Sequence, residues 1–184
     1  MSSLLTSRRT LRALFATAVL VAVAACYERA PAGPDQRLIS AVPDGAVQVV
    51  LQQESVSGNE LTLVARIIGN GIDVGAYQGE IKFVPGSLEL VGVTTPTADN
   101  EMHIVNPAQF AQGRLRFAAY TTASKFTSSE AFTVRVRTAH ALADAQIVGS
   151  LEVVGEPAGR AIAKNKLLAS RGIHDAVTNQ LIVP

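Results

Sequence analysis

The sequence predicts an all-β protein: an antiparallel, jelly-roll-like β-sandwich preceded by a leader and a flexible linker. Three observations predict this class. From residue 46 onward the apolar residues mostly alternate with polar ones, which is the period of a half-buried strand. Turns rich in glycine, asparagine, proline and serine separate these segments. No long amphipathic helix lies between them, and parallel crossovers would need such helices.

The first element is a leader over residues 1–25. Arg8, Arg9 and Arg12 precede an uncharged and mostly apolar run from Ala13 to Ala25. A charged segment followed by an apolar one is the order of a secretory signal peptide. The run is shorter than the ~20 apolar residues that a membrane-spanning helix needs. The leader therefore predicts export.

The single cysteine of the chain, Cys26, follows Val23, Ala24 and Ala25. This order resembles the lipobox of bacterial lipoproteins, and the resemblance implies that the Cys26 thiol carries a diacylglyceryl group and becomes the first mature residue. Two or more acyl chains hold a protein stably on membrane lipid. Tyr27, where an inner-membrane retention signal would have aspartate, implies the outer membrane. The alternative is an ordinary signal peptide with a cysteine nearby.

The mature chain is close to neutral and long enough for one domain. Without residues 1–25 it keeps thirteen basic and fifteen acidic residues, a net charge of about −2, which does not indicate a nucleic-acid partner. Proline and glycine in residues 26–42 predict a tether. We expect the sandwich at residues 43–160. Residues 161–184 form an extension, which ends either in a last strand at 180–183 or in a frayed terminus.

Each predicted strand contributes a row of apolar side chains to the core. Turns at 57–60 and 85–87 separate three of them, and Pro85 and Gly86 suit a tight reversal. The expected rows are Val47, Val49 and Leu51; Leu61, Leu63, Ala65 and Ile67; Tyr77, Gly79, Ile81 and Phe83; residues 88–94; Leu115, Phe117 and Ala119; Phe132, Val134 and Val136; and Ile147, Leu151 and Val153.

Three segments resemble cohesin domains: residues 71–95 resemble their third and fourth strands, 112–121 a glycine-led inner strand, and 131–138 a late strand with phenylalanine. The resemblance implies a cohesin-like sandwich whose partner is a protein, either dockerin-like or another envelope protein. One turn departs from the family pattern, because Phe83, Val84 and Pro85 stand where the family commonly has tyrosine, aspartate and proline.

Two arginine pairs are candidate partner-binding residues. Arg114 and Arg116 lie two residues apart on one predicted strand, as do Arg135 and Arg137 on another, so each pair projects from one face. If the two strands are neighbours, the guanidinium groups form a patch for carboxylate or phosphate. The alternative is two solvated faces paired with glutamates. Tyr120 and Phe126 supply aromatic contact to a partner or cap the core.

The sequence offers no set of catalytic or metal-binding residues. His103, His140 and His174 are scattered, which predicts surface or turn histidines and no metal site. Asp99, Asn100 and Glu101 read as a solvated turn, with a calcium loop as the alternative. No nucleotide, phosphate or hydrolase motif appears, so we expect neither enzyme nor cofactor. A histidine with an acid, or two carboxylates, in one deep cleft would indicate an enzyme.

These features predict a lipid-anchored binding module of the cell envelope that contacts a protein or mediates adhesion through a sheet face. The alternative is a carbohydrate-binding module or an accessory subunit of a polysaccharide-processing enzyme. Sugar-stacking rows favour tryptophan and tyrosine, and this chain has no tryptophan and three tyrosines.

Overall fold

The structure is a computed structural model that describes residues 42–178 and 180–183. The chain divides into two units, Met1–Gly33 and Pro34–Pro184, and every described strand belongs to the second. The predicted leader, Cys26 and residues 27–41 of the tether lie outside the described residues.

The described chain is built of strands with short 3-10 turns. The strands are β1 (Val47–Ser57), β2 (Glu60–Gly69), β3 (Ala76–Lys82), β4 (Leu88–Thr94), β5 (Glu101–Asn106), β6 (Arg114–Thr121), β7 (Glu130–Thr138), β8 (Val148–Gly155), β9 (Leu167–Leu168), β10 (Ser170–Arg171), β11 (Ile173–Asp175) and β12 (Leu181–Val183). The 3-10 helices are η1 (Phe110–Gln112), η2 (Leu142–Ala145) and η3 (Lys164–Lys166).

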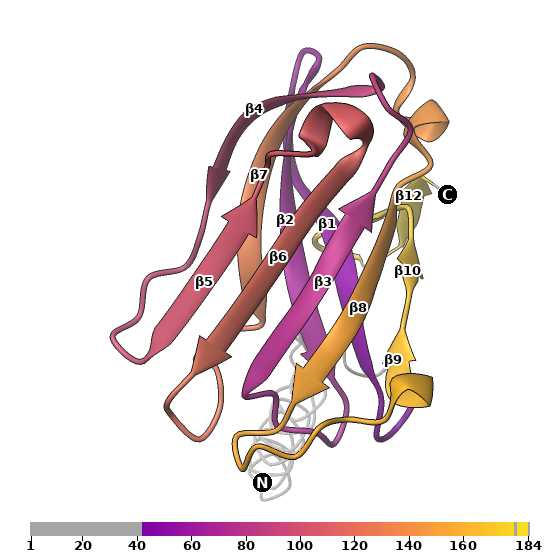
Figure 1. The fold of residues 1–184 in the computed structure, drawn as a ribbon. Helices are drawn as coiled ribbons and strands as arrows, with labels where there is room; N and C mark the ends of the chain where they lie inside the picture. Colours follow the sequence, from indigo (N-terminus) through magenta and orange to yellow (C-terminus); the bar gives the residue numbers. More distant parts are fainter. Residues whose placement is uncertain (1–41, 179, 184) are drawn as a thin grey trace, which may run out of the picture. The chain divides into compact units, whose positions relative to one another are not determined.

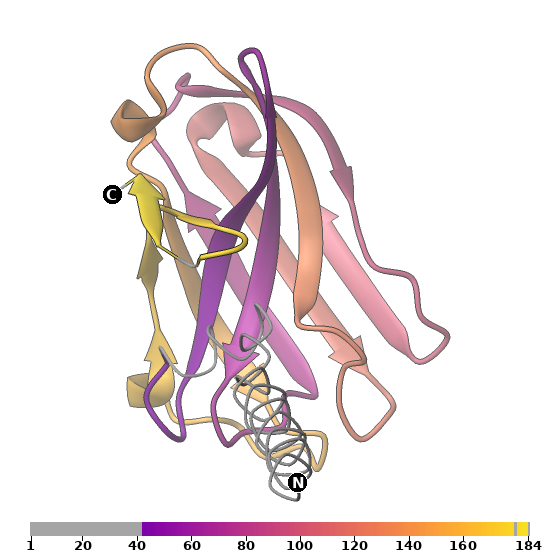
Figure 2. The ribbon, with the colours of Figure 1, turned by 180° about the vertical axis from the view of Figure 1, so that it is seen from behind.

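The strands form two sheets that pack face to face, so the predicted β-sandwich is confirmed. Sheet A has the order β12-β11-β1-β2-β7-β4, with β9 also pairing β1, and sheet B has the order β10-β8-β3-β6-β5. In Figure 1 sheet B lies in front of sheet A, and Figure 2 shows sheet A from the other side. Neighbours in space are mostly distant in sequence, as in the β2–β7 and β3–β8 pairs.

The core fills the space between the inner faces of the sheets. Its fully buried side chains include Phe132 from sheet A and Leu115 from sheet B. Phe117 on β6 meets Phe132 on β7 with ring centroids 5.2 Å apart, which ties the two sheets together. The predicted inward rows on β1, β2, β3, β6 and β7 are buried.

The two sheets differ on their outer faces. A second, smaller cluster covers part of the outer face of sheet A, where Val42, Ala46 and Leu168 pack over Val50 and Ile68. That cover comes from the first described residues and from β9. In the described part of the chain, no comparable cluster lies on the outer face of sheet B.

The C-terminal extension belongs to the sandwich. The strand predicted at 180–183 lies at Leu181–Val183, and the side chain of Ile173 on β11 is fully buried in the main core. β9 and β11 run parallel to β1, whereas the prediction was purely antiparallel. These pairings form because the extension returns along β1 after the turn at η3.

Two further elements differ from the prediction. β5 was not expected, because two of its three apolar residues, Met102 and Ile104, face outward. Val153 was expected inside but is 55% exposed, because the β3–β8 register shifts between Gln78 and Gly79, and Val154 takes the inward place. Within the described ranges, no helix is long and apolar enough to cross a membrane.

Candidate functional site: the outer face of sheet B

In β5 two polar side chains point into the sandwich and two large apolar side chains point to solvent, which is the opposite of the usual arrangement in a strand. Met102 and Ile104 are 48% and 53% exposed, while the side chains of Glu101 and His103 are only 1% and 2% exposed. Alternate residues of a strand point to opposite faces, so burying the two polar side chains places the two apolar ones on the surface.

A hydrogen-bonded network satisfies the buried polar groups of β5. His103 Nε2 lies 3.1 Å from Glu101 Oε2, and Tyr77 Oη lies 3.3 Å from His103 Nδ1. An ionised carboxylate can only accept, so Nε2 carries the hydrogen and Nδ1 accepts from the tyrosine hydroxyl. The Thr127 N–H donates to Glu101 Oε1 over 2.6 Å. The network therefore joins β5 to β3 and to the loop before β7.

The charge state of the network follows from these contacts. Burial raises the pKa of Tyr77, and the nearby Glu101 charge raises it further, so the phenol remains a donor. Burial opposes ionisation of Glu101, but hydrogen bonds from Thr127 and His103 outweigh it and lower its pKa. The carboxylate thus stays ionised inside the sandwich.

The outer face of sheet B divides into an apolar half and a charged half. Strand register aligns its side chains in rows: Met102, Tyr120 and Ala76; then Ile104, Ala118, Gln78 and Val153; then Asn106, Arg116, Glu80 and Ser150; then Arg114, Lys82 and Val148. The first two rows hold four large exposed apolar side chains, Met102, Ile104, Tyr120 and Val153, which we call the apolar patch.

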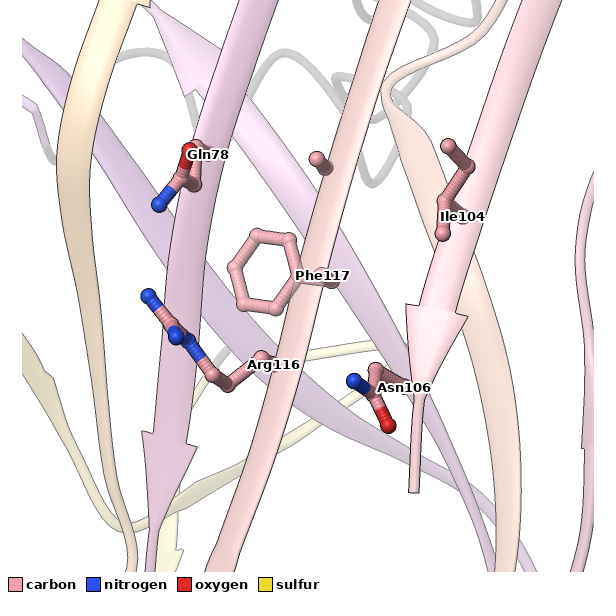
Figure 3. A pocket seen from close by; sticks show the side chains of 6 residues that line it. Gln78, Ile104, Asn106, Arg116 and Phe117 are labelled. Atoms are coloured by element: carbon pink, nitrogen blue, oxygen red, sulfur yellow. The ribbon is translucent and has the colours of Figure 1, made fainter. Parts of the chain in front are cut away.

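A shallow hollow of about 220 Å³ marks the boundary between the two halves. Figure 3 shows Ile104 and Asn106 on one side of it, Gln78 and Arg116 on the other, and the Phe117 ring between β3 and β6. Gln78 Nε2 donates to Glu152 Oε2 over 2.7 Å, which holds the amide on this face. The hollow has room for a side chain of a partner.

In the charged half, basic side chains surround one buried carboxylate. Glu80 Oε2 accepts from Arg114 Nη2 over 2.6 Å, and Lys82 Nζ lies 2.5 Å from Glu80 Oε1. Burial opposes ionisation of Glu80, but these hydrogen bonds and charges outweigh it and lower its pKa. Arg116 reaches the half-exposed Glu152 over 3.4 Å. Three exposed cations thus face two acids, one of which is buried.

The four predicted arginines do not form one patch. β6 lies in sheet B and β7 in sheet A, so Arg114 and Arg116 face away from Arg135 and Arg137. The β7 pair contacts acids of its own sheet: Arg135 lies 3.5 Å from Glu60, and Arg137 lies 3.0 Å from Glu89. The condition for a shared anion site, that the two strands are neighbours, is therefore not met.

The two predicted aromatic residues lie in different places. Tyr120 is 47% exposed within the apolar patch. Phe126 packs against Tyr77 and His103, with ring centroids 5.2 and 5.5 Å away. It lines a separate groove of about 260 Å³ with Tyr77, Asp73 and Lys125.

The prediction of surface histidines was wrong for His103, because its side chain is buried between Tyr77 and Glu101. A histidine beside an acid is thus present, but both side chains are covered, so the pair is not exposed in a cleft. Asp99 and Asn100 form the exposed turn as predicted, whereas Glu101 begins β5. Among the described residues, no three His, Cys, Asp or Glu side chains are grouped to hold a metal ion.

Comparisons with known proteins give structural likenesses only. No protein-family model and no curated protein matches the chain. Similar solved structures include a cohesin module of a family 33 glycoside hydrolase from Clostridium perfringens, at 13% identity and a TM-score of 0.46, covering 71% of this chain and 96% of the module. A non-cellulosomal cohesin from Archaeoglobus fulgidus gives 13% and 0.46, covering 64% and 83%.

A further match is the sixth cohesin of scaffoldin B from Acetivibrio cellulolyticus, solved in complex with a dockerin, at 10% identity and a TM-score of 0.44, covering 64% of this chain and 90% of that cohesin. All three TM-scores lie below 0.5. The assignment of a β-sandwich rests on the strand order of this chain and not on these scores.

Proposed function

We propose that the chain is a lipid-anchored binding module of the cell envelope that recognises a protein partner through the outer face of sheet B. The observation that carries the proposal is the apolar patch. Large exposed apolar side chains gathered on one face mark interaction sites in soluble proteins. The other large exposed apolar side chains of the described chain lie near turns or the C-terminus: Val56, Val84, Val177, Leu181 and Ile182.

The composition of the face suits protein recognition. Interface cores favour tyrosine, methionine and arginine, with polar residues around them. Here Tyr120 and Met102 form one row, and Arg116 lies two rows away beside the hollow. The complementary surface presents apolar side chains to the patch and an acidic group to Arg114, Arg116 and Lys82.

The residues around the apolar patch suit binding better than catalysis. Its neighbouring ionisable groups are held in ion pairs, as Arg114 is with Glu80 and Arg116 with Glu152. Such pairs provide charge and geometry for recognition but no free acid, base or nucleophile.

A pull-down tests this function. The bait is Pro34–Pro184, which holds every described strand and the whole described core, incubated with envelope extract. We expect one protein partner, with capture reduced about tenfold or more by Tyr120→Glu and by Val153→Lys, since buried anchors dominate interface energies. The matched control is Val56→Lys, equally exposed on β1, which should bind as the parent does.

Capture of a polysaccharide and no protein would support the carbohydrate-binding alternative and overturn the proposal. Equal loss for Val56→Lys and Val153→Lys would show that capture does not depend on the outer face of sheet B.

The lipid anchor has a separate test in the full chain. We expect a fatty-acid analogue to label the protein and Cys26→Ser to abolish the label, because the single thiol is the acceptor. The labelled protein should fractionate with the outer membrane, and Tyr27→Asp should shift it to the inner membrane. Undiminished labelling of Cys26→Ser would overturn the anchor without affecting the proposed binding face.

A further inference from the structure

The edges of the two sheets are protected unequally. In the described chain, the edge strands of sheet A are β12 and β4, and the edge strands of sheet B are β10 and β5. Natural edge strands are kept from pairing with other chains by shortness, bulges, proline, lysine or inward-pointing charges. β10 has two residues and β12 has three, while β4 is broken by a register shift between Leu90 and Gly92.

β5 is neither short nor bulged, and its one inward-pointing charge, Glu101, is satisfied by hydrogen bonds from His103 and Thr127. It pairs with β6 over six consecutive residues without a register shift, and it contains no proline and no lysine. The residue that ends it, Asn106, is followed by Pro107. β5 is therefore a regular edge strand.

The main chain of β5 is open to solvent along this edge. The side chains of Glu101 and His103 are 1% and 2% exposed, yet both residues as a whole are partly exposed. Their exposed surface must then come from backbone atoms. A strand whose outer backbone is accessible is a template for another strand, because its outward N–H and C=O groups lack a neighbour.

We propose that β5 of one copy pairs antiparallel with β5 of a second copy, which joins two copies of sheet B into one continuous sheet. A two-fold axis perpendicular to the sheet keeps the outer faces on the same side. Side chains of opposed residues must then point to the same face of the sheet. This requires one residue of β5 to lie opposite its own copy, so that the axis passes at the level of that residue and not between two residues.

Two positions for the axis give equal overlap, and the side chains favour one of them. With the axis at His103, Met102 opposes Ile104 of the second copy and Glu101 opposes Val105. With the axis at Ile104, Met102 opposes the polar Asn106, and Pro107 enters the pairing without an N–H to donate. The His103 register therefore makes two apolar Met102–Ile104 pairs on the outer face. The Ile104 register makes one apolar pair, Ile104 with its copy, and two pairs of Met102 with Asn106.

The same register avoids charge repulsion. The only carboxylate of β5, Glu101, opposes an apolar residue, and neither lysine nor arginine lies on the strand. His103 opposes its own copy, and both of its ring nitrogens are hydrogen-bonded within its own protomer, to Glu101 and Tyr77. Like charges directly opposite each other destabilise a sheet, and this strand has none to oppose when it pairs with itself. A second copy is thus a partner whose edge matches in length, register and charge.

Sedimentation velocity over a concentration series tests the dimer with Pro34–Pro184. We expect a monomer–dimer equilibrium in which Ile104→Lys raises the dimer dissociation constant by about tenfold or more. Val153→Lys also replaces an exposed β-branched apolar residue of the same face with lysine, but at β8, away from the β5 edge, and should leave the dissociation constant unchanged. Monomer at every concentration, or a dimer that Ile104→Lys does not weaken, would overturn the proposal.

Disulfide trapping fixes the register. Pro34–Pro184 contains no cysteine, so Met102→Cys combined with Ile104→Cys introduces the only thiols. Opposed residues in antiparallel strands bring their Cβ atoms about 4.5–5.5 Å apart, close to what a disulfide spans. Oxidation should give a covalent dimer that reductant separates. If Met102→Cys combined with Asn106→Cys cross-links instead, the axis lies at Ile104 and the proposed register is wrong.

This inference is independent of the proposed function. Val153→Lys is expected to weaken partner capture and to leave the dimer intact, whereas Ile104→Lys weakens the dimer. A protein that dimerises but captures nothing, or captures a partner as a monomer, would separate the two proposals.

Discussion

At the scale of single residues, the buried side chains of Glu101 and His103 on β5 are tolerated because each of their polar atoms has a hydrogen-bond partner. A buried donor or acceptor without a partner costs far more than an ordinary hydrogen bond contributes. Glu101 accepts from both His103 and Thr127, and His103 is bonded on both ring nitrogens. These bonds allow a carboxylate and an imidazole to occupy places that apolar side chains usually fill.

Replacing His103 with leucine should reveal this dependence. The variant leaves one oxygen of Glu101 and the Tyr77 hydroxyl without a partner, so we expect the free energy of unfolding to fall by about 1–3 kcal/mol. Urea denaturation measures the loss. The control, His140→Leu at an exposed bend, should stay within about 0.5 kcal/mol of the parent. Equal effects at both sites would mean that the network contributes no stability.

The two buried carboxylates predict how stability changes with pH. Contacts in the folded state lower the pKa of Glu80 and of Glu101 from the ordinary value of 4.5. Both groups therefore stabilise the fold above that value, and the contribution is lost as pH falls through their lowered pKa. We expect the free energy of unfolding to decrease between about pH 5 and pH 2.

Combining Glu80→Gln with Glu101→Gln is the control for this pH dependence. The double variant should start from a lower stability at neutral pH and lose less on acidification. A parent protein whose stability is constant or rises over the acid range would contradict the prediction.

At the scale of secondary-structure elements, strands whose alternation follows the core could be predicted from sequence. Tyr77 and Ile81 on β3, like Leu115 and Phe117 on β6, are apolar at every second place and are buried. β5 escaped prediction because it alternates with the opposite phase, and its polar residues are satisfied by Tyr77 and Thr127, which are distant in sequence. Its phase depends on tertiary contacts, which local periodicity does not report.

A turn glycine offers a second test at this scale. Gly113, at the start of β6, has φ +77°, and a Cβ there would lie 2.1 Å from the Phe83 carbonyl oxygen. Gly86 has a similar φ of +78° with nothing within 4 Å. We expect Gly86→Ala to cost about 1–2 kcal/mol for its backbone conformation and Gly113→Ala clearly more, because the clash adds to it. Thermal unfolding compares the two, and equal losses would contradict the packing at Gly113.

At the scale of the whole molecule, the order of strands decides which residues share a surface. The sequence correctly indicated that each arginine pair projects from one face. It did not show that β6 and β7, which follow each other in the chain, lie in opposite sheets. The alternative prediction, arginines paired with glutamates on solvated faces, matches the observed contacts of Arg114 and Arg137. Strand order follows from long-range pairing, and alternation alone does not specify it.

The C-terminal extension provides a test at this scale. Deleting residues 161–184 removes β9 and β11, which pair with β1 on the side away from β2, and the fully buried Ile173. Truncating one such side chain to alanine costs about 2–5 kcal/mol, so the deletion should lower stability by at least that much or abolish cooperative unfolding. Deleting only 176–184, which spares Ile173, is the matched control. A deletion of 161–184 that melts like the parent would show that the extension is dispensable.

The smaller apolar cluster on the outer face of sheet A makes the two outer faces of the sandwich different. The first described residues, Val42 and Ala46, pack on the outer face of sheet A, so the chain enters the domain on the side opposite the apolar patch. A partner that approaches the opposite face meets Met102, Ile104, Tyr120 and Val153, and the first described residues do not cover them.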